Sequence, residues 1–307
     1  MSAKPPVFSK VRLRFARPWN LLAGRIVNLL PVKTAKALRI RRIKGRLRAE
    51  TIAKRVPHGL PGQLIVSLAS HPPRFATLSL TLSCLRNQTV VPDRIMLWIA
   101  RGDLIQFRKR FGSEIRGVSV AECDDVRSFA KLVPCLEQFP EAFIVTADDD
   151  AYYEPEWLET IVRAFDPLAP TIVCQRAHRI RIDDVTGDPL PYRLWEWDVQ
   201  DEASRQPSSD LEPTGVAGIL YPPGCLHRDA TRRDLFLKLC PFSDDMWFYF
   251  MARRRGTLCK KTGGKFELKF WPGSQDQALW MVNNVNVAND DQIKALVAEF
   301  GFPITSG

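Results

Sequence analysis

Apolar, strand-like runs alternate with helix-like segments over residues 63–146, and this alternation limits the fold more than any other feature of the chain. The runs are short, rich in branched or aromatic side chains, and bounded by turn residues. The expected strands are Gln63–Ala69, Arg94–Ala100, Gly117–Ala121 and Ala142–Thr146. The expected helices between them are Phe75–Arg86, Leu104–Phe111 and Ser128–Gln138. Such alternation builds parallel β-α-β units, so we expect an α/β fold with a Rossmann-like, mostly parallel sheet flanked by helices.

The first 60 residues differ in charge from the rest of the chain. Of the 44 Lys and Arg, 16 lie in residues 1–60, where Glu50 is the single acid, which gives this segment a net charge of +15. The other 28 basic residues stand against 33 of the 34 acids, a net charge of −5. We therefore expect a basic extension over residues 1–60, partly helical or disordered, followed by one domain over residues 61–307.

The extension combines an apolar stripe with a basic run. Apolar residues from Leu21 to Leu30 approximate one helical face, and a dense basic run, Arg39–Arg48, follows them. An anionic membrane surface is one possible partner, because each Lys or Arg near acidic lipid gains about 1 kcal/mol. A disordered basic tail is the alternative. Aromatic residues are sparse here, so we expect no nucleic acid partner.

Cysteine usage and hydropathy indicate where the protein resides. The seven cysteines are odd in number, scattered and without a CxxC pair, which favours reduced thiols over disulfides or a zinc site. The chain contains no run of 18 apolar residues, and Arg25 and Asn28 interrupt the apolar piece that most resembles a signal peptide. We expect a cytoplasmic protein, either free or peripheral on the cytoplasmic face of a membrane.

Three consecutive acids, Asp148, Asp149 and Asp150, end the fourth expected strand. Carboxylates gathered at the end of a buried strand repel one another, and a divalent cation with a phosphate behind it offsets that repulsion. A solvated acidic turn, or acids near the start of the following helix, is the alternative. In doubly wound sheets the ligand binds beyond the C-terminal ends of the strands, where this triplet lies.

The other strand ends carry polar residues that suit the same ligand. The first strand leads into a loop from Ser67 to Arg74 that contains Ser70 and two prolines, and the third leads to Asp125. Lys131 lies one helical turn after Arg127, which ends the same polar cluster. Arg74 and Lys131 can neutralise a diphosphate, while an aspartate can accept hydrogen bonds from a ribose hydroxyl or a base. A surface ion pair and a plain proline turn are the alternatives for these clusters.

At this point the chain resembles the GT-A fold, nucleotide-sugar-dependent glycosyltransferases, in particular family-2-like enzymes. The resemblance covers about residues 63–255. It depends on the motifs Ile65–Arg74, Leu85–Thr89 with Pro92–Ile95, Asp125 with Lys131, and Ile144–Asp150. The family implies a nucleoside-diphosphate sugar donor, with a UDP-sugar favoured, and a Mn²⁺ or Mg²⁺ ion between the acidic motif and the diphosphate. Residues 61–150 would then form the nucleotide-binding half and residues 151–307 the acceptor half.

The resemblance also implies roles for single residues. Asp150 would be the direct metal ligand, while Asp148 and Asp149 would contact the ribose, the metal or its water shell. Asp125 would contact the nucleoside. The phosphates would be bound by Arg74 or Lys131, and Ser70 would belong to the same donor site. GT-A enzymes often add a C-terminal histidine as a ligand, whereas this chain has no histidine after His227.

The second half offers candidates for the general base and for the acceptor side. Asp244 and Asp245 lie at an expected helix start, where family-2-like inverting enzymes place their base; we favour Asp245, because Ser243 or Asp244 also suits a helix cap. Gly218, in a glycine-containing strand and turn, would approach the donor sugar or the acceptor. Trp247 and His178 are further acceptor candidates, each with a structural alternative as a core or hydrogen-bonded residue. Trp195 and Trp197 mark a further segment expected near the acceptor.

We therefore expect a metal-dependent, inverting glycosyltransferase that moves a sugar from a nucleoside diphosphate to a glycan or a lipid-linked acceptor. A sugar-phosphate nucleotidyltransferase is the enzyme alternative, although the chain lacks the Gly-rich basic loop expected there after the first strand. A catalytically silent binding or scaffold protein that keeps the fold is the alternative from a different class.

Overall fold

The computed structural model describes residues 41, 43, 45, 55–274 and 288–303. The chain divides into two compact units, residues 1–49 and residues 50–307, and the account below concerns the second unit. The extension predicted over residues 1–60 lies almost wholly outside the described residues, so its helix and its membrane role stay predictions. No helix within the described ranges combines the length and the apolar character needed to cross a bilayer.

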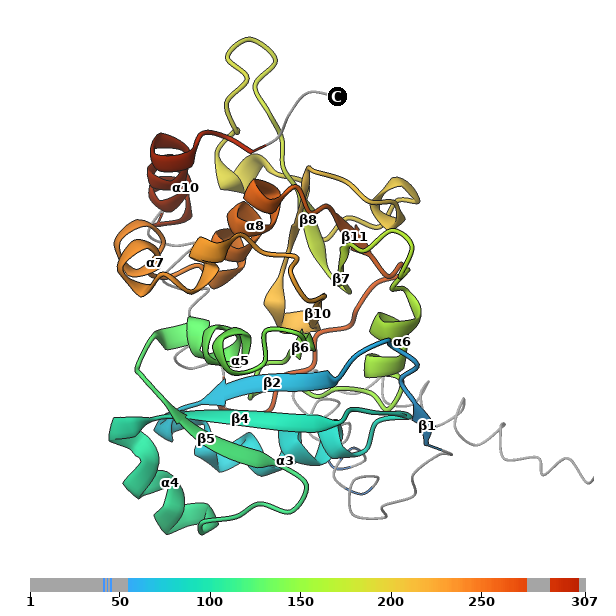
Figure 1. Cartoon of the computed structure of the whole chain (residues 1–307), viewed down its shortest axis with the longest axis vertical. Helices are drawn as coiled ribbons and strands as arrows, with labels where there is room; N and C mark the ends of the chain where they lie inside the picture. The colour runs from blue at the N-terminus through green and yellow to red at the C-terminus, as the bar shows by residue number, and fades with distance from the viewer. Residues whose placement is uncertain (1–40, 42, 44, 46–54, 275–287, 304–307) are drawn as a thin grey trace, which may run out of the picture. The chain divides into compact units, whose positions relative to one another are not determined.

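A seven-stranded sheet organises the second unit (Figure 1). In chain order its strands are β2 (Leu64–Ser70), β4 (Arg94–Ala100), β5 (Ser119–Cys123), β6 (Phe143–Thr146), β7 (Ile172–Cys174), β10 (Ile219–Tyr221) and β11 (Cys259–Lys261). Their order across the sheet is β11-β7-β10-β6-β2-β4-β5. Because β10 is antiparallel to both β6 and β7 while the other pairs are parallel, every strand of this sheet except β10 runs in one direction.

Helices connect the parallel strands of the first half, as the alternating pattern predicts, and further helices follow in the second half. Those of the first half are α3 (Phe75–Arg86), α4 (Leu104–Phe111) and α5 (Val133–Gln138), and those of the second half are α6 (Trp157–Arg163), α7 (Arg233–Leu239), α8 (Asp244–Arg255) and α10 (Ala288–Phe300). Figure 1 shows α3 and α5 on opposite sides of strands β2 and β4. The expected α/β fold with a mostly parallel sheet flanked by helices is confirmed.

One predicted helix, Ser128–Gln138, is instead two short elements. A 3-10 helix, η3 (Arg127–Lys131), precedes α5, and Leu132 between them leaves the helical conformation. Pro134 explains the break, because proline has no N–H to donate to an earlier carbonyl and is tolerated only in the first turn of a helix. The break matters for the site, since it places Lys131 at the end of η3.

Two small sheets and several 3-10 turns complete the described residues. A parallel pair joins β1 (Val56–Pro57) to β3 (Val90–Val91), and an antiparallel pair joins β8 (Ala177–Arg179) to β9 (Leu211–Pro213). The other 3-10 turns are η1 (Pro72–Arg74), η2 (Arg101–Asp103), η4 (Tyr192–Leu194), η5 (Ala203–Arg205), η6 (Gly215–Ala217) and η7 (Arg228–Thr231). The antiparallel pair β8–β9 leads the chain from β7 back to η6 and β10.

The core fills both faces of the sheet. In β2 nearly every side chain is buried, as in a parallel strand covered on two sides. A large apolar cluster on one face joins Ile65 and Trp98 of the sheet to Phe129, Phe236 and Trp247. All seven cysteines are buried and unpaired, as the sequence predicts for reduced thiols. This packing fixes the C-terminal ends of β2, β5 and β6 at one edge of the sheet, together with the turn that precedes β10.

Candidate active site

The aspartate triplet directly follows β6, and neighbouring elements hold its backbone. The backbone N–H of Asp148 donates to the hydroxyl of Tyr153 at 2.8 Å. The hydroxyl of Thr81, on the buried side of α3, donates to the carbonyl oxygens of Asp149 and Ala151 at 2.8 and 3.2 Å. These contacts fix the turn, so the three carboxylates leave it in set directions.

The two buried carboxylates of the triplet have different partners. Ser70, the last residue of β2, donates its hydroxyl to Asp149 Oδ2 at 2.6 Å. The guanidinium of Arg74 pairs with Asp150 Oδ2. Burial raises the pKa of Asp149 to about 7, and burial together with the charge of Asp148 raises the pKa of Asp150 to about 6. The triplet therefore favours an added positive charge, since a cation would stabilise both carboxylates in the ionised form.

Lys131 joins the triplet to the acidic pair of the second half. Its Nζ lies 3.2 Å from Asp148 Oδ1 and 3.0 Å from Asp244 Oδ2. Burial alone would lower the pKa of Lys131, but the charges of Asp148, Asp244 and Asp245 outweigh it and raise that pKa well above its ordinary value. The two acidic motifs, nearly a hundred residues apart in sequence, are thus parts of one site.

Asp245, in the first turn of α8, is held by the turn before β10. The backbone N–H of Gly215 donates to Asp245 Oδ2 at 2.8 Å. A Cβ on Gly215 would lie 2.7 Å from both Asp245 Oδ1 and Lys131 Nζ, so only glycine fits between them without displacing either side chain. Burial and the charge of Asp244 raise the pKa of Asp245 to about 7, despite the opposing effects of Lys131 and the Gly215 N–H.

The carboxylate oxygens around the triplet fit a hard divalent cation only if a bound phosphate ligand adds further oxygen atoms. Within the described ranges, no group of three or more His, Cys, Asp or Glu side chains is arranged to hold a metal ion. Asp148 and Asp150 supply carboxylate oxygens, the atoms that Mg²⁺ and Mn²⁺ prefer, but each is already paired with a basic side chain. One or two carboxylates plus substrate phosphates and water is a usual shell for Mg²⁺, so these residues fit the metal bound together with a diphosphate.

Asp125 lies at the rim of the site, apart from the buried acids. Its side chain is exposed, and Oδ1 accepts a hydrogen bond from the N–H of Arg127 at 3.2 Å. Arg127 has a φ of 57°, and its side chain donates to the carbonyl of Pro241 at 3.1 Å and covers the ring of Phe242. Arg127, the first residue of η3, thereby contacts the loop before α8. The nucleoside role of Asp125 stays a prediction.

Three residues predicted for the acceptor side have structural partners. Gly218, with a φ of 98°, lies against α6, where a Cβ would come within 2.6 Å of the Trp157 ring. Trp247 is fully buried and donates its Nε1 to the carbonyl of Ala230 at 2.9 Å, which is the core alternative. His178 is also buried: its Nδ1 accepts the N–H of Asp198 at 3.0 Å, and burial with the nearby Arg176 lowers its pKa to about 3. These contacts favour the structural alternatives, and the acceptor roles of the three residues stay predictions.

Some residues of the site are not singled out by the sequence. Thr81 gives a weak signal, as a polar residue on the otherwise apolar face of a helix. Tyr153 lies close to the triplet in the sequence, but an aromatic residue at this position indicates a core side chain. Glu212 is a buried acid within the short strand β9, and its Oε2 has no hydrogen-bond partner. Burial first, and the charge of Asp245 next, raise the pKa of Glu212 well above its ordinary value, while Arg176 opposes them.

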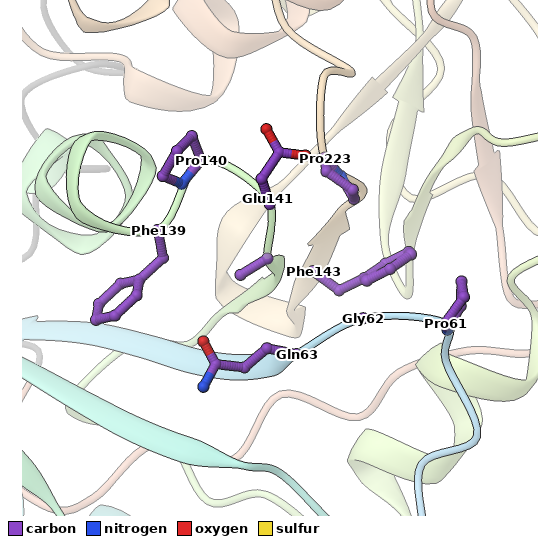
Figure 2. Close-up of a pocket in the computed structure, with 9 residues that line it drawn as sticks. Pro61, Gly62, Gln63, Phe139, Pro140, Glu141, Phe143 and Pro223 are labelled. Carbon is purple, nitrogen blue, oxygen red and sulfur yellow. The ribbon is translucent and has the colours of Figure 1, made fainter.

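A surface cavity of about 630 Å³ lies away from these acids (Figure 2). Its walls include Gln63 just before β2, Phe143 at the start of β6 and Pro223 just after β10, with Phe139 and Pro140 beside them. Since β10 runs against β2 and β6, all three positions belong to the opposite edge of the sheet from the triplet. This cavity therefore does not coincide with the acid cluster.

Comparison with solved structures finds similar but remote folds. A 4-diphosphocytidyl-2C-methyl-D-erythritol synthase is 14% identical, with 73% of this chain and 99% of that chain covered and a TM-score of 0.42. The enzyme of the same name from Anaerococcus prevotii DSM 20548 is 12% identical, with 73% and 96% covered and a TM-score of 0.41. A manganese complex of Rv0371C from Mycobacterium tuberculosis H37Rv is 22% identical over 38% of this chain, with a TM-score of 0.31.

These likenesses assign no activity. The chain spans 64% of the length of the Rv0371C structure, and every TM-score quoted is below 0.5. No protein-family model matches the chain, and no curated protein matches it either. The family-2-like glycosyltransferase assignment is therefore not confirmed, and the function has to be argued from the residues of the site.

Proposed function

We propose that this protein is a metal-dependent, inverting glycosyltransferase that uses a nucleoside-diphosphate sugar, with Asp245 as the general base. The observation that carries the proposal is the position of Lys131, whose Nζ contacts Asp148 of the triplet and Asp244 beside the candidate base. A sugar donor whose diphosphate lies at the triplet would thus have its reacting carbon close to α8. Donor binding and proton removal are then possible within one site.

On this proposal the cationic side chains serve the diphosphate. Arg74 and Lys131 are both largely buried and can form charge-assisted hydrogen bonds to phosphate oxygens in exchange for those to Asp150 and Asp148. A bound Mn²⁺ or Mg²⁺, held by Asp150 and Asp148, would supply further positive charge as the diphosphate leaves. The rate then depends on how well these fixed charges stabilise the leaving group.

Asp245 suits the proton transfer. Its pKa of about 7 is close to physiological pH, where a carboxylate can accept a proton from an acceptor hydroxyl and still be ionised in a good fraction of molecules. The Gly215 N–H keeps Oδ2 in place, and Oδ1 has no hydrogen-bond partner in the described structure. On this proposal Asp245 accepts the proton as the hydroxyl attacks the sugar from the face opposite the diphosphate, and acceptor binding has to open access to the carboxylate, because Oδ1 is buried in the described structure.

A sugar-phosphate nucleotidyltransferase is the second candidate. Two of the similar structures are named 4-diphosphocytidyl-2C-methyl-D-erythritol synthases, and that name matches this candidate better than the first. An acidic site at strand ends with a metal would serve this reaction as well. It has no evident use for a carboxylate of raised pKa on α8, which is why we place it second.

Two product assays separate the candidates. The chain is incubated with Mn²⁺ and a panel of UDP-, GDP- and dTDP-sugars, and release of the nucleoside diphosphate is measured. In parallel it is incubated with CTP or UTP and sugar 1-phosphates, and release of pyrophosphate is measured. We expect nucleoside diphosphate without pyrophosphate; pyrophosphate release alone would establish the second candidate.

Two variants then test the assigned residues. We expect Asp150→Ala to lose both the reaction and the thermal stabilisation by UDP with Mn²⁺, because it removes a metal ligand. Asp245→Asn should lose at least about 100-fold in rate yet keep that stabilisation, because it removes only the base. Full activity in both variants would leave the assignment without support. Asp234→Asn, in an exposed pair with Arg232 on the surface, is the control.

A further inference from the structure

Trp197 is a ring held partly open to solvent on the acceptor half of the protein. Its exposed fraction is 44%, and it is the one aromatic residue among the exposed large apolar side chains of the described residues. The neighbouring Trp195 is 4% exposed. A single exposed apolar residue is common on protein surfaces, and what sets this indole apart is how its neighbours hold it.

The ring is fixed in place by its neighbours. Its centroid lies 4.9 Å from that of His178, with the planes inclined by 36°, and 5.3 Å from that of Tyr192 in an edge-on arrangement. Nε1 donates to the carbonyl of Tyr192 at 3.2 Å. The polar atom of the indole is therefore satisfied within the loop, and the exposed part of the ring is carbon surface.

The backbone next to Trp197 is held in an uncommon conformation. Asp198 has a φ of 50°, a region that residues other than glycine seldom adopt. Its N–H donates to His178 Nδ1 at 3.0 Å, and Gln200 Nε2 donates to its carbonyl at 2.8 Å. Such a conformation persists only where surrounding contacts enforce it, and here His178 and Gln200 supply those contacts.

The ring belongs to the same region as the candidate base. His178, on which Trp197 packs, pairs across the strands with Glu212 of β9. Three residues after Glu212 the chain reaches Gly215, whose N–H binds Asp245. Trp197 is thus joined, through His178 and Glu212, to the turn that binds Asp245. Tyr192, which borders the indole, has its pKa raised by burial first and then by the charges of Glu212 and Asp245.

We infer that Trp197 is a stacking platform for a pyranose ring of the acceptor, next to the ring whose hydroxyl is glycosylated. This inference rests on the proposed function. A pyranose presents a flat face of C–H groups that fits carbon surface, and its hydroxyls need polar partners at the rim. Asp198, Arg176 and Gln200 provide them, with Arg176 Nε 3.8 Å from Asp198 Oδ1. A saccharide thus fits the site better than a purely apolar chain.

The test compares Trp197→Ala, Trp197→Phe and Leu194→Ala, the last being an exposed apolar residue of the same loop. Binding is measured without donor, by saturation-transfer NMR on methyl glycosides and β- and α-linked disaccharides of glucose, galactose, mannose and N-acetylglucosamine. We expect the wild type and Leu194→Ala to bind at least one saccharide, Trp197→Ala to lose at least tenfold in affinity, and Trp197→Phe to lose less.

The outcomes separate this inference from the proposed function. UDP with Mn²⁺ should raise the melting temperature of Trp197→Ala as it does that of the wild type, which shows an intact donor site. The platform is overturned if the wild type binds no saccharide, or if Trp197→Ala binds saccharides with the affinity of the wild type. Either result counts even if sugar transfer is detected. If Trp197→Ala keeps saccharide binding but loses binding to phosphatidylglycerol vesicles, Trp197 contacts lipid, and this result would also overturn the saccharide platform.

Discussion

Single residues of the site are paired by charge before any ligand arrives. Asp150 is paired with Arg74 and Asp148 with Lys131, so both acids expected to bind the metal are already neutralised. A metal ion alone would have to compete with these basic side chains. A diphosphate would draw the same side chains toward itself and free the carboxylates. Metal and nucleotide should therefore bind far better together than apart.

The first prediction concerns Arg74. We expect Arg74→Gln to bind Mn²⁺ about tenfold more tightly than the wild type when nucleotide is absent, because Asp150 loses a competing cation. The same variant should bind UDP in the presence of Mn²⁺ about tenfold more weakly, since one phosphate partner is gone; tenfold corresponds to about 1.4 kcal/mol. Electron paramagnetic resonance of free Mn²⁺ measures the first effect and calorimetry the second.

Arg108→Gln is the matched control, because Arg108 is an exposed basic residue in the last turn of α4. It carries the same loss of charge but lies outside the acid cluster, so both affinities should stay within about twofold of wild type. Mn²⁺ binding by Arg74→Gln that is no tighter than wild type would show that the ion pair does not compete with the metal.

The second prediction concerns pH. A base must be deprotonated to work, and burial with the charge of Asp244 raises the pKa of Asp245 to about 7. The rate constant for transfer should therefore rise about tenfold per pH unit below 7 and level off above it. Asp149 has a similar pKa, so Asp149→Asn is the control. We expect the rate constant of Asp149→Asn to fall below pH 7 as it does in the wild type. If this fall is absent in Asp149→Asn, the titrating group is Asp149 and not Asp245.

At the scale of elements, local patterns predict most of the first half. The bounds of α3, β4 and α4 are those expected from residues 75–86, 94–100 and 104–111, because apolar spacing and turn residues define them within the segment itself. Pro134 explains the one broken helix. The aspartate triplet could likewise be placed at a strand end from the sequence, since it directly follows an apolar run.

Contacts between distant segments could not be predicted in this way. Strand β10 inserts between β6 and β7 although it follows both in the chain, and no local spacing encodes such a pairing. The approach of Gly215 to Asp245, and the double contact of Lys131, depend on that insertion. The chemistry of Trp247 and His178 makes them candidates in the sequence, whereas their burial is decided by how α8 and β8 pack.

The third prediction tests the turn before β10. Gly218→Ala should lower the free energy of unfolding by roughly 3 kcal/mol, because φ is 98° and the new Cβ would meet Trp157 and Ile161 at 2.6 and 2.9 Å. Gly224→Ala is the control, with a φ of 69° and nothing within 4 Å of the Cβ. In urea unfolding, Gly224→Ala should lower the free energy of unfolding by only about 1 kcal/mol. Equal losses in the two variants would contradict the packing argument.

The whole molecule separates its charge into two parts. Residues 1–60 carry a net charge of +15 and the remainder a net charge of −5. The site has its own basic residues, Arg74 and Lys131, and so does not need the extension for the diphosphate. On the proposed function, the positive charge of residues 1–60 would instead suit an anionic surface, where a lipid-linked acceptor would be found.

The fourth prediction is that removal of residues 1–54 abolishes binding to anionic vesicles. The cut leaves Arg55, which donates to the carbonyl of Arg86 at 2.8 Å, and keeps the pairing of Val56–Pro57 with Val90–Val91. It removes 15 of the 16 basic residues of the extension. At about 1 kcal/mol for each charge near acidic lipid, even two or three contacts correspond to a loss of well over tenfold.

Co-sedimentation with phosphatidylglycerol vesicles measures this loss, and phosphatidylcholine vesicles control for binding that does not depend on charge. Binding of the full chain should weaken as salt rises from 50 to 500 mM, because screening shortens the reach of the lipid charges. Stabilisation by UDP with Mn²⁺ should be the same in both chains, since the donor residues all follow residue 60. A truncated chain that sediments with anionic vesicles as fully as the intact one would place the membrane contact on the domain itself.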